Sequence, residues 1–149
     1  MRFLIVSGAL LLASSTFASP PASPIAPPQA IAMAAKAGPA GVRGTFVMQV
    51  AATGKSHGHV FLNSQADYRD PGNLSINIAP WITDKMTSRF GAPPETFFKD
   101  KRIVVRGTVK RVPIGISDNK YTPPKQVYFQ THVDVLQVSQ IDLAGTPAG

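Results

Sequence analysis

Residues 101–111, with the sequence KRIVVRGTVKR, decide the fold class of this chain. Apolar Ile103, Val105 and Val109 alternate with polar or charged residues, which is the period of a strand with one buried face. Gly107 interrupts the apolar face. A glycine inside a strand often marks a bulge or a sharp bend, as the closure of a barrel requires.

Three further strands are predicted upstream, at residues 42–50, 59–64 and 74–79, because apolar and polar residues alternate there too. Residues 51–58 are rich in Gly and small polar residues and are predicted to form a loop or hairpin tip. Residues 67–73 contain Asp-Pro-Gly-Asn, in which Pro fixes φ and Gly accepts a positive φ. This segment is therefore expected to be a turn.

The segment after the third strand changes period. Ile82, Met86 and Phe90 recur at four-residue spacing, as on one face of a helix. Thr83 is predicted to cap the start of this helix and Gly91 to end it.

Downstream of the strand at 101–111, Pro113 is expected to end the extended run. Residues 114–126 are predicted to form a long loop, and residues 127–138 the last long strand, followed by residues 139–143. The order strand, strand, strand, helix, strand, strand predicts a mainly β domain, a five-stranded OB-fold barrel with one helix between strands 3 and 4. A six-element α+β sandwich is the competing topology.

The N-terminal part predicts export. Residues 1–18 combine Arg2, an uncharged apolar run and small residues before a cleavage site, which is typical of a signal peptide. The alternative is a membrane anchor, but the run is shorter than the roughly 20 residues needed to span a bilayer. Residues 19–41 are rich in Pro and Ala and are predicted to be a disordered linker. The domain is expected over residues 42–143 and a disordered tail over residues 144–149, in a periplasmic or secreted protein.

Several short motifs follow one another in the predicted domain. They are FLNS at 61–64, DYRDP at 67–71, LSINI at 74–78, KRIVVRGTV at 101–109 and SQIDL at 139–143. This series resembles small exported bacterial proteins that look like OB-fold domains of the nucleic-acid-binding class, of the kind found beside extracellular nucleases. The resemblance covers about residues 46–143 and implies the OB fold and a nucleic-acid type of partner. The predicted loop at 114–126 is longer than the tight hairpin usual in those proteins.

Composition narrows the classes of function. The chain has no cysteine, which excludes disulfides, thiolate metal sites and a cysteine nucleophile. With 15 basic and eight acidic residues its net charge is +7. Neither a Gly-x-Ser-x-Gly turn nor a Gly-rich phosphate loop is present. The sequence therefore predicts a non-enzymatic binding domain, with no catalytic residue and no cofactor.

The charge gathers on the strand at 101–111. Period-two geometry places Arg102, Arg106 and Lys110 on one face, about 13 Å apart at roughly 3.3 Å per residue, where they could neutralise the phosphates of a nucleic acid. The alternative is a solvated face that blunts the edge of the sheet. Exposed aromatic rings often accompany such a basic row. The predicted ligand-binding residues are Lys55, Arg102, Arg106, Lys110, Lys120, Tyr121, Lys125 and Tyr128.

His57 and His59 suggest a metal site, for which His132 or Asp134 would have to supply a third ligand. Two solvated loop histidines are the preferred interpretation, and no metal is predicted. The expected partner is single-stranded nucleic acid or another polyanion. The alternative function is a periplasmic protein- or envelope-interaction module, which would use an apolar patch instead of a basic groove.

Overall fold

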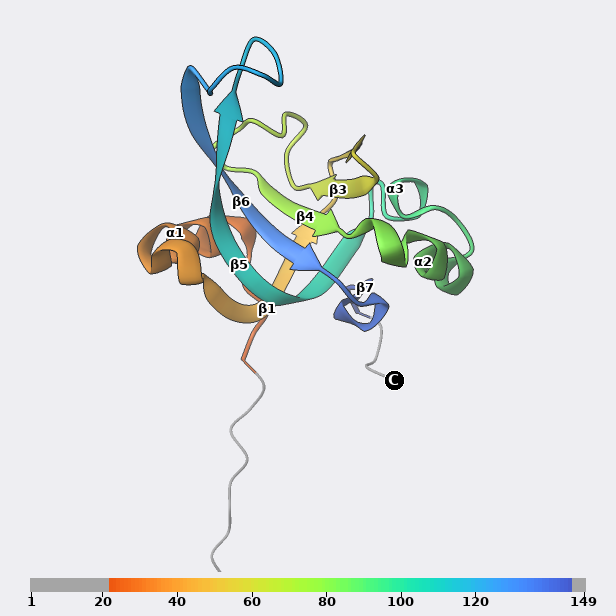
Figure 1. The fold of residues 1–149 in the computed structure, drawn as a ribbon. Helices are drawn as coiled ribbons and strands as arrows, with labels where there is room; N and C mark the ends of the chain where they lie inside the picture. Colours follow the sequence, from red (N-terminus) through yellow and green to blue (C-terminus); the bar gives the residue numbers. More distant parts are fainter. Residues whose placement is uncertain (1–21, 146–149) are drawn as a thin grey trace, which may run out of the picture.

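The computed structural model describes residues 22–145, so the predicted signal peptide and the last four residues of the predicted tail lie outside it. The strands are β1 (Val42–Gln49), β2 (Ala52–Ser56), β3 (His59–Asn63), β4 (Leu74–Ile78), β5 (Arg102–Ile116), β6 (Gln126–Val135) and β7 (Ile141–Leu143) (Figure 1). The helices are α1 (Pro27–Ala37), α2 (Thr83–Phe90) and α3 (Pro94–Phe97), with short 3-10 turns η1 (Gly38–Ala40), η2 (Pro80–Ile82) and η3 (Val138–Gln140). No helix within residues 22–145 has the length and apolar character to cross a membrane.

The strands form one sheet in the order β1-β5-β6-β4-β3-β2, with β7 added on β5. All pairs are antiparallel except β4 and β6, which run parallel. The mainly β class is therefore confirmed. The prediction of five strands in a barrel is wrong, because the sheet has seven strands and its hydrogen-bonded path is open. Its two end strands, β1 and β2, are separated in the chain only by Val50 and Ala51.

The core lies on the face predicted from the alternation in the sequence. On β5, Ile103, Val105 and Val109 are at most 1% exposed, and on β1 Phe46 and Met48 are buried as well. Burying a side chain of this size contributes roughly 1.5–3 kcal/mol. The alternating residues thus fix which side of each strand faces inward.

β5 is longer than predicted, because it continues through Pro113 to Ile116. Beyond Val109 only β6 pairs with it, so a missing N–H on the open edge of the strand loses no ladder bond. The part of the β5–β6 hairpin formed by residues 112–130 projects from the sheet (Figure 1) and is called the hairpin arm here. The predicted long loop at 114–126 shrinks to residues 117–125.

Residues 52–56 are also extended rather than looped, since β2 pairs with β3 along its whole length. The turn of this hairpin is His57 and Gly58, both with positive φ. The small residues of this segment therefore belong to a strand whose partner lies directly after it in the chain.

The linker predicted at 19–41 is wrong where the structure describes a helix. Pro27 and Pro28 occupy the first turn of α1, where the missing N–H of proline leaves no bond unmade. The alanines that follow favour a helix, and Ala30 and Ala34 are fully buried four residues apart, against β5 and β1. Ile25 also hydrogen-bonds to β1. The prolines start a helix that packs on the sheet instead of forming an extended spacer.

The helix predicted after the third strand is α2. Ile82 and Met86 are buried, and Gly91 ends the helix with a φ of 85°, as predicted. The predicted capping role of Thr83 is wrong, because its hydroxyl donates to the carbonyl of Pro80 in the preceding turn.

Candidate functional site

The sheet has an outer face, formed by the residues that alternate with the core. Cross-strand partners lie on the same side of a sheet, so the register identifies them. The outer face comprises Arg43 and Thr45 on β1, Phe61 and Asn63 on β3, Ser75 and Asn77 on β4, Arg106, Thr108, Lys110 and Ile114 on β5, and Tyr128, Gln130, His132 and Asp134 on β6.

His132 lies at the centre of this face and is only 8% exposed. Its Nε2 is 2.7 Å from Oε1 of Gln130, and Nε2 of Gln130 donates to the Tyr128 hydroxyl at 2.6 Å. Burial lowers the pKa of His132 below its ordinary value of 6.5, against the attraction of Asp134 and with a smaller contribution from Lys110. A neutral imidazole that donates from Nε2 fits this environment.

A second polar chain ties four strands together. Nδ1 of His59 is 2.8 Å from Oδ1 of Asn77, and Nδ2 of Asn77 donates to Oδ1 of Asp134 at 2.9 Å. The other carboxylate oxygen of Asp134 is 3.2 Å from Nζ of Lys110. The ring of Phe61 packs on both His59 and His132, with centroids about 6 Å apart. These contacts form a ridge across the outer face.

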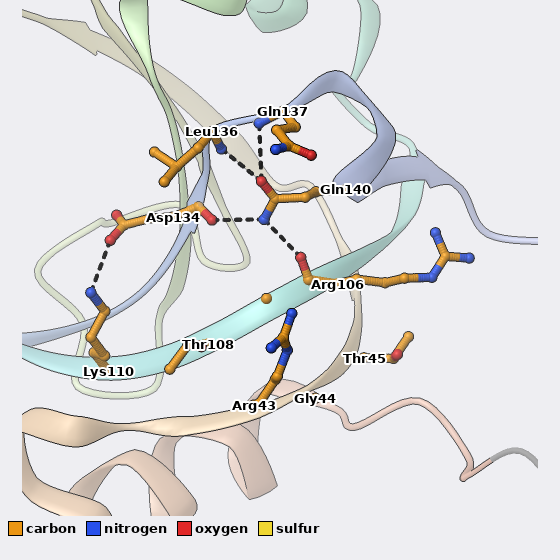
Figure 2. A pocket seen from close by; sticks show the side chains of 11 residues that line it. Arg43, Gly44, Thr45, Arg106, Thr108, Lys110, Asp134, Leu136, Gln137 and Gln140 are labelled. Atoms are coloured by element: carbon orange, nitrogen blue, oxygen red, sulfur yellow. Dashed lines mark hydrogen bonds and ion pairs between the residues drawn. The ribbon is translucent and has the colours of Figure 1, made fainter.

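On one side of the ridge is a cleft of about 740 Å³, which we call the arginine cleft. Its lining residues come from β1, β5 and the segment after β6, and Figure 2 shows them from close by. They are Arg43, Gly44, Thr45, Arg106, Gly107, Thr108, Lys110, Asp134, Leu136, Gln137 and Gln140. Three cations therefore meet a single carboxylate, and that carboxylate is already bound by Lys110 and Asn77.

Gln140 closes the wall of the arginine cleft where β5 has no strand partner on one edge, between the β7 and β6 pairings. Its Nε2 donates to the carbonyls of Arg106 and Asp134 at 2.9 and 3.1 Å, and its Oε1 accepts from the backbone N–H groups of Leu136 and Gln137 (Figure 2). One side chain thus replaces the missing ladder bonds and holds the two walls at a fixed separation.

On the other side of the ridge is a cleft of about 510 Å³, which we call the tyrosine cleft. Phe61, Tyr68 and Tyr128 line it together with Lys55 of β2. Nζ of Lys55 is 2.9 Å from a carboxylate oxygen of Glu95, and this hydrogen bond lowers the pKa of Glu95. Aromatic side chains from three parts of the chain thus share a cleft with one cation.

The predicted ligand-binding residues fall into separate groups. Arg106 and Lys110 line the arginine cleft, whereas Lys55 and Tyr128 line the tyrosine cleft. The rest line neither cleft, and they are Arg102 on β5 and Lys120, Tyr121 and Lys125 in the loop of the hairpin arm.

In that loop, Lys120 lies over the ring of Tyr121, which is 83% exposed, and Lys125 forms an ion pair with Asp118. The predicted residues therefore form three patches, with Arg102 outside all of them, instead of one groove.

The distribution of acids leaves the arginines available. All eight acidic residues of the chain lie within residues 22–145, and five of them form ion pairs. In this described part, no carboxylate pairs with Arg43, Arg102 or Arg106, all of which are exposed. Their charge is therefore open to an anion from solution.

Sequence reasoning missed Arg43, Thr45 and Thr108. All three alternate with core residues, which is a signal that the sequence carried. Thr108 lies on the same strand as Arg106, whereas the position of Arg43 and Thr45 beside Arg106 depends on the register between β1 and β5, which are about 60 residues apart in the chain. Local periodicity cannot supply that register.

The metal hypothesis gains no geometric support. Among residues 22–145, no three or more acidic or histidine side chains are grouped as a metal ion would need. His57 lies in the β2–β3 turn and contacts Ser56, whereas His59 is bound to Asn77.

Comparison with known proteins adds little. No protein family matches the chain, and no curated protein matches it. Among solved structures, an aspartyl tRNA synthetase from Entamoeba histolytica is similar, with 18% sequence identity and a TM-score of 0.39 over 76% of this chain and 21% of the synthetase. The chain thus spans about a fifth of that enzyme. A likeness of this size carries no argument about function.

Proposed function

We propose that this protein is an exported, non-enzymatic domain of the OB type that binds single-stranded nucleic acid or another polyanion on its outer sheet face. One observation carries the proposal. The same face holds the arginine cleft, whose guanidinium groups have no carboxylate partner within residues 22–145, and the tyrosine cleft, whose aromatic rings lie beside a lysine.

The strand order supports the OB assignment. If β1 and β2 act as one strand bent at Val50 and Ala51, the sheet has six strands. The first five along the chain have α2 between the third and the fourth, and β7 is added on β5. The parallel β4–β6 pair then joins the third strand to the fifth. Binding between the loops and across the strands is common for this fold.

The arginine cleft suits the phosphate group of a nucleotide, and the tyrosine cleft suits its base. Arginines neutralise phosphates and release counterions, which makes such binding fall with salt. Tyrosine and phenylalanine rings stack on bases, at about 1–3 kcal/mol per base. The ridge of Phe61 and His132 connects the clefts, so a flexible strand crossing it could use both. A duplex, whose bases are already stacked, has less to gain from the tyrosine cleft.

The first test is fluorescence anisotropy with labelled single-stranded DNA and RNA, titrated with salt. The double change Arg102→Glu and Arg106→Glu should abolish binding, because it places two negative charges where phosphates would lie. The control is Lys85→Glu with Lys99→Glu, which changes the net charge equally but lies in α2 and in the turn before β5 instead of on the strand face that carries Arg102 and Arg106. The control should keep most of the affinity.

Equal affinity of the Arg102/Arg106 double variant and the wild type would reject the proposal. So would equal losses in the two double variants, because they would show an effect of net charge alone.

A second test measures binding to anionic vesicles, because a second candidate function, an envelope-interaction module, has its own supporting observation. On the opposite side of the hairpin arm, Val127 and Phe129 are about half exposed, and Arg111 lies 3.8 Å from the centroid of the Phe129 ring. Apolar side chains next to a cation suit an anionic lipid surface. Binding to vesicles without binding to oligonucleotides would favour this second candidate.

A further inference from the structure

We propose that Arg43, Thr45, Arg106 and Thr108, called the Arg–Thr quartet here, bind one tetrahedral oxyanion, namely a phosphate or sulfate group. The inference rests on the proposed function for the polymer that would carry the group, but the oxyanion site itself can be tested alone.

The register of β1 and β5 builds the quartet. Thr45 lies opposite Arg106, and Arg43 lies opposite Thr108. The two arginines are therefore diagonal neighbours, as are the two threonines, with Cα atoms about 7–8 Å apart along a diagonal. Two forked donors and two hydroxyl groups thus surround one small area at the mouth of the arginine cleft.

Electrostatics favour an anion at this place. The two arginines are diagonal neighbours of like charge on one face of the sheet, and no carboxylate within residues 22–145 pairs with either of them. The one acid of the cleft, Asp134, already holds Lys110. An oxyanion between the guanidinium groups would replace their repulsion with charge-assisted hydrogen bonds, for which the planar fork of arginine is well suited.

The frame of the site is rigid while its donors are free to move. Figure 2 shows the Arg43 and Arg106 side chains extending in different directions from their paired strands. Long exposed side chains change rotamer within nanoseconds, so both can turn toward an anion without moving the backbone. Gln140 anchors the carbonyl of Arg106, which keeps the backbone of the site in position.

The probe is inorganic phosphate or sulfate, compared with chloride at equal ionic strength. Calorimetric titration of the wild type should detect binding, and the melting temperature should rise with phosphate or sulfate more than with chloride. Arg43→Gln or Arg106→Gln should raise the dissociation constant about tenfold or more, since each removes a charge-assisted contact. Lys85→Gln, with the same change in charge, should leave it unchanged.

Amide chemical shifts locate the anion and remain informative if a variant is less stable. The proposal expects the largest shifts at Thr45, Arg106 and Thr108. Shifts centred elsewhere, or equal affinity in the wild type and both arginine variants, would overturn it.

Single-stranded oligonucleotide and heparin then serve as competitors and distinguish the sources of the group. If sulfate binds at the quartet and heparin alone competes, the inference stands while nucleic-acid binding fails. If oligonucleotides bind but the quartet variants bind them and phosphate normally, the proposed function stands and the inference fails.

Discussion

The two halves of β5 form one continuous strand in opposite environments. Residues 102–109 pair with β1, and β7 adds a second partner at residues 103–105, so Ile103 is fully buried. Residues 110–116 pair only with β6, and Ile116 is 48% exposed. Similar strand-forming residues thus serve the core in one half and the solvent-exposed hairpin arm in the other.

This difference teaches that strand propensity and burial are separate properties. Alternating β-branched residues form an extended chain in both halves. What packs on the strand decides whether they stabilise the fold. In the first half, neighbouring strands and α1 cover the apolar face, whereas the second half has β6 as its one partner strand within the described residues.

The sharpest test replaces one isoleucine in each half. Ile103→Ala should lower the free energy of unfolding by about 2–5 kcal/mol, because it opens a cavity in the core. Ile116→Ala should change it by no more than about 0.5 kcal/mol. Denaturant titration measures both. If the two variants lost similar amounts of unfolding free energy, the arm would be packed in solution and the two halves of β5 would not differ in burial.

A smaller difference is expected between two glycines of the same strand. A Cβ at Gly107 would lie 2.8 Å from Cγ1 of Val133 in the core, so Gly107→Ala should destabilise by about 1–3 kcal/mol through overpacking.

A Cβ at Gly115 would lie 2.6 Å from Cγ of Pro124, so the backbone of the exposed loop that carries this proline would have to move, which we expect to cost little. Gly115→Ala should therefore leave the melting temperature close to that of the wild type. A greater loss of stability in Gly115→Ala than in Gly107→Ala would mean that the arm is the more rigid half.

The smallest effect concerns the junction of the halves, where His132 lies opposite Lys110. Burial lowers the pKa of His132, so the unfolded chain binds the proton more readily than the folded one. The contribution of His132 to the free energy of unfolding should therefore be fully present above about pH 6.5, the ordinary pKa of His, and should decrease as the pH drops below that value. One group contributes at most about 1.4 kcal/mol per pH unit.

The measurement is the free energy of unfolding at pH 7 and pH 5.5, a window above the carboxylate range. His132→Gln should flatten the decrease, whereas His57→Gln, which removes an exposed turn histidine, should not. An unchanged decrease in the His132 variant would assign the pH dependence to other groups.

Local periodicity predicted the core faces well. The buried side chains of β4, β5 and α2 follow spacings of two and four residues that any window of the sequence shows. The wrong predictions involved residues whose structural effect depends on their position. Proline breaks a central strand but is tolerated on an open edge, as at Pro113, and it starts a helix at Pro27.

The candidate site was harder to predict than the core. Arg106 and Lys110 were found because they share a strand face, which is a local property. Their cleft needs Arg43 from β1 and Gln140 from the segment after β6. Contacts between such distant segments depend on strand register, which the sequence pattern leaves open.

By itself, the sequence determined that this chain is mainly β, which side of each strand is apolar, and that its basic residues far outnumber its acids. These properties depend on residue type and on near neighbours in the chain. Only the tertiary structure decided that β5 would be buried at one end and exposed at the other, that α1 would pack on the sheet, and that Arg43 and Arg106 would line one cleft with no carboxylate partner within residues 22–145. Those outcomes depend on which distant segments pair. Apart from proline, every residue has the same backbone hydrogen-bonding groups, so these groups do not specify which segment pairs with which.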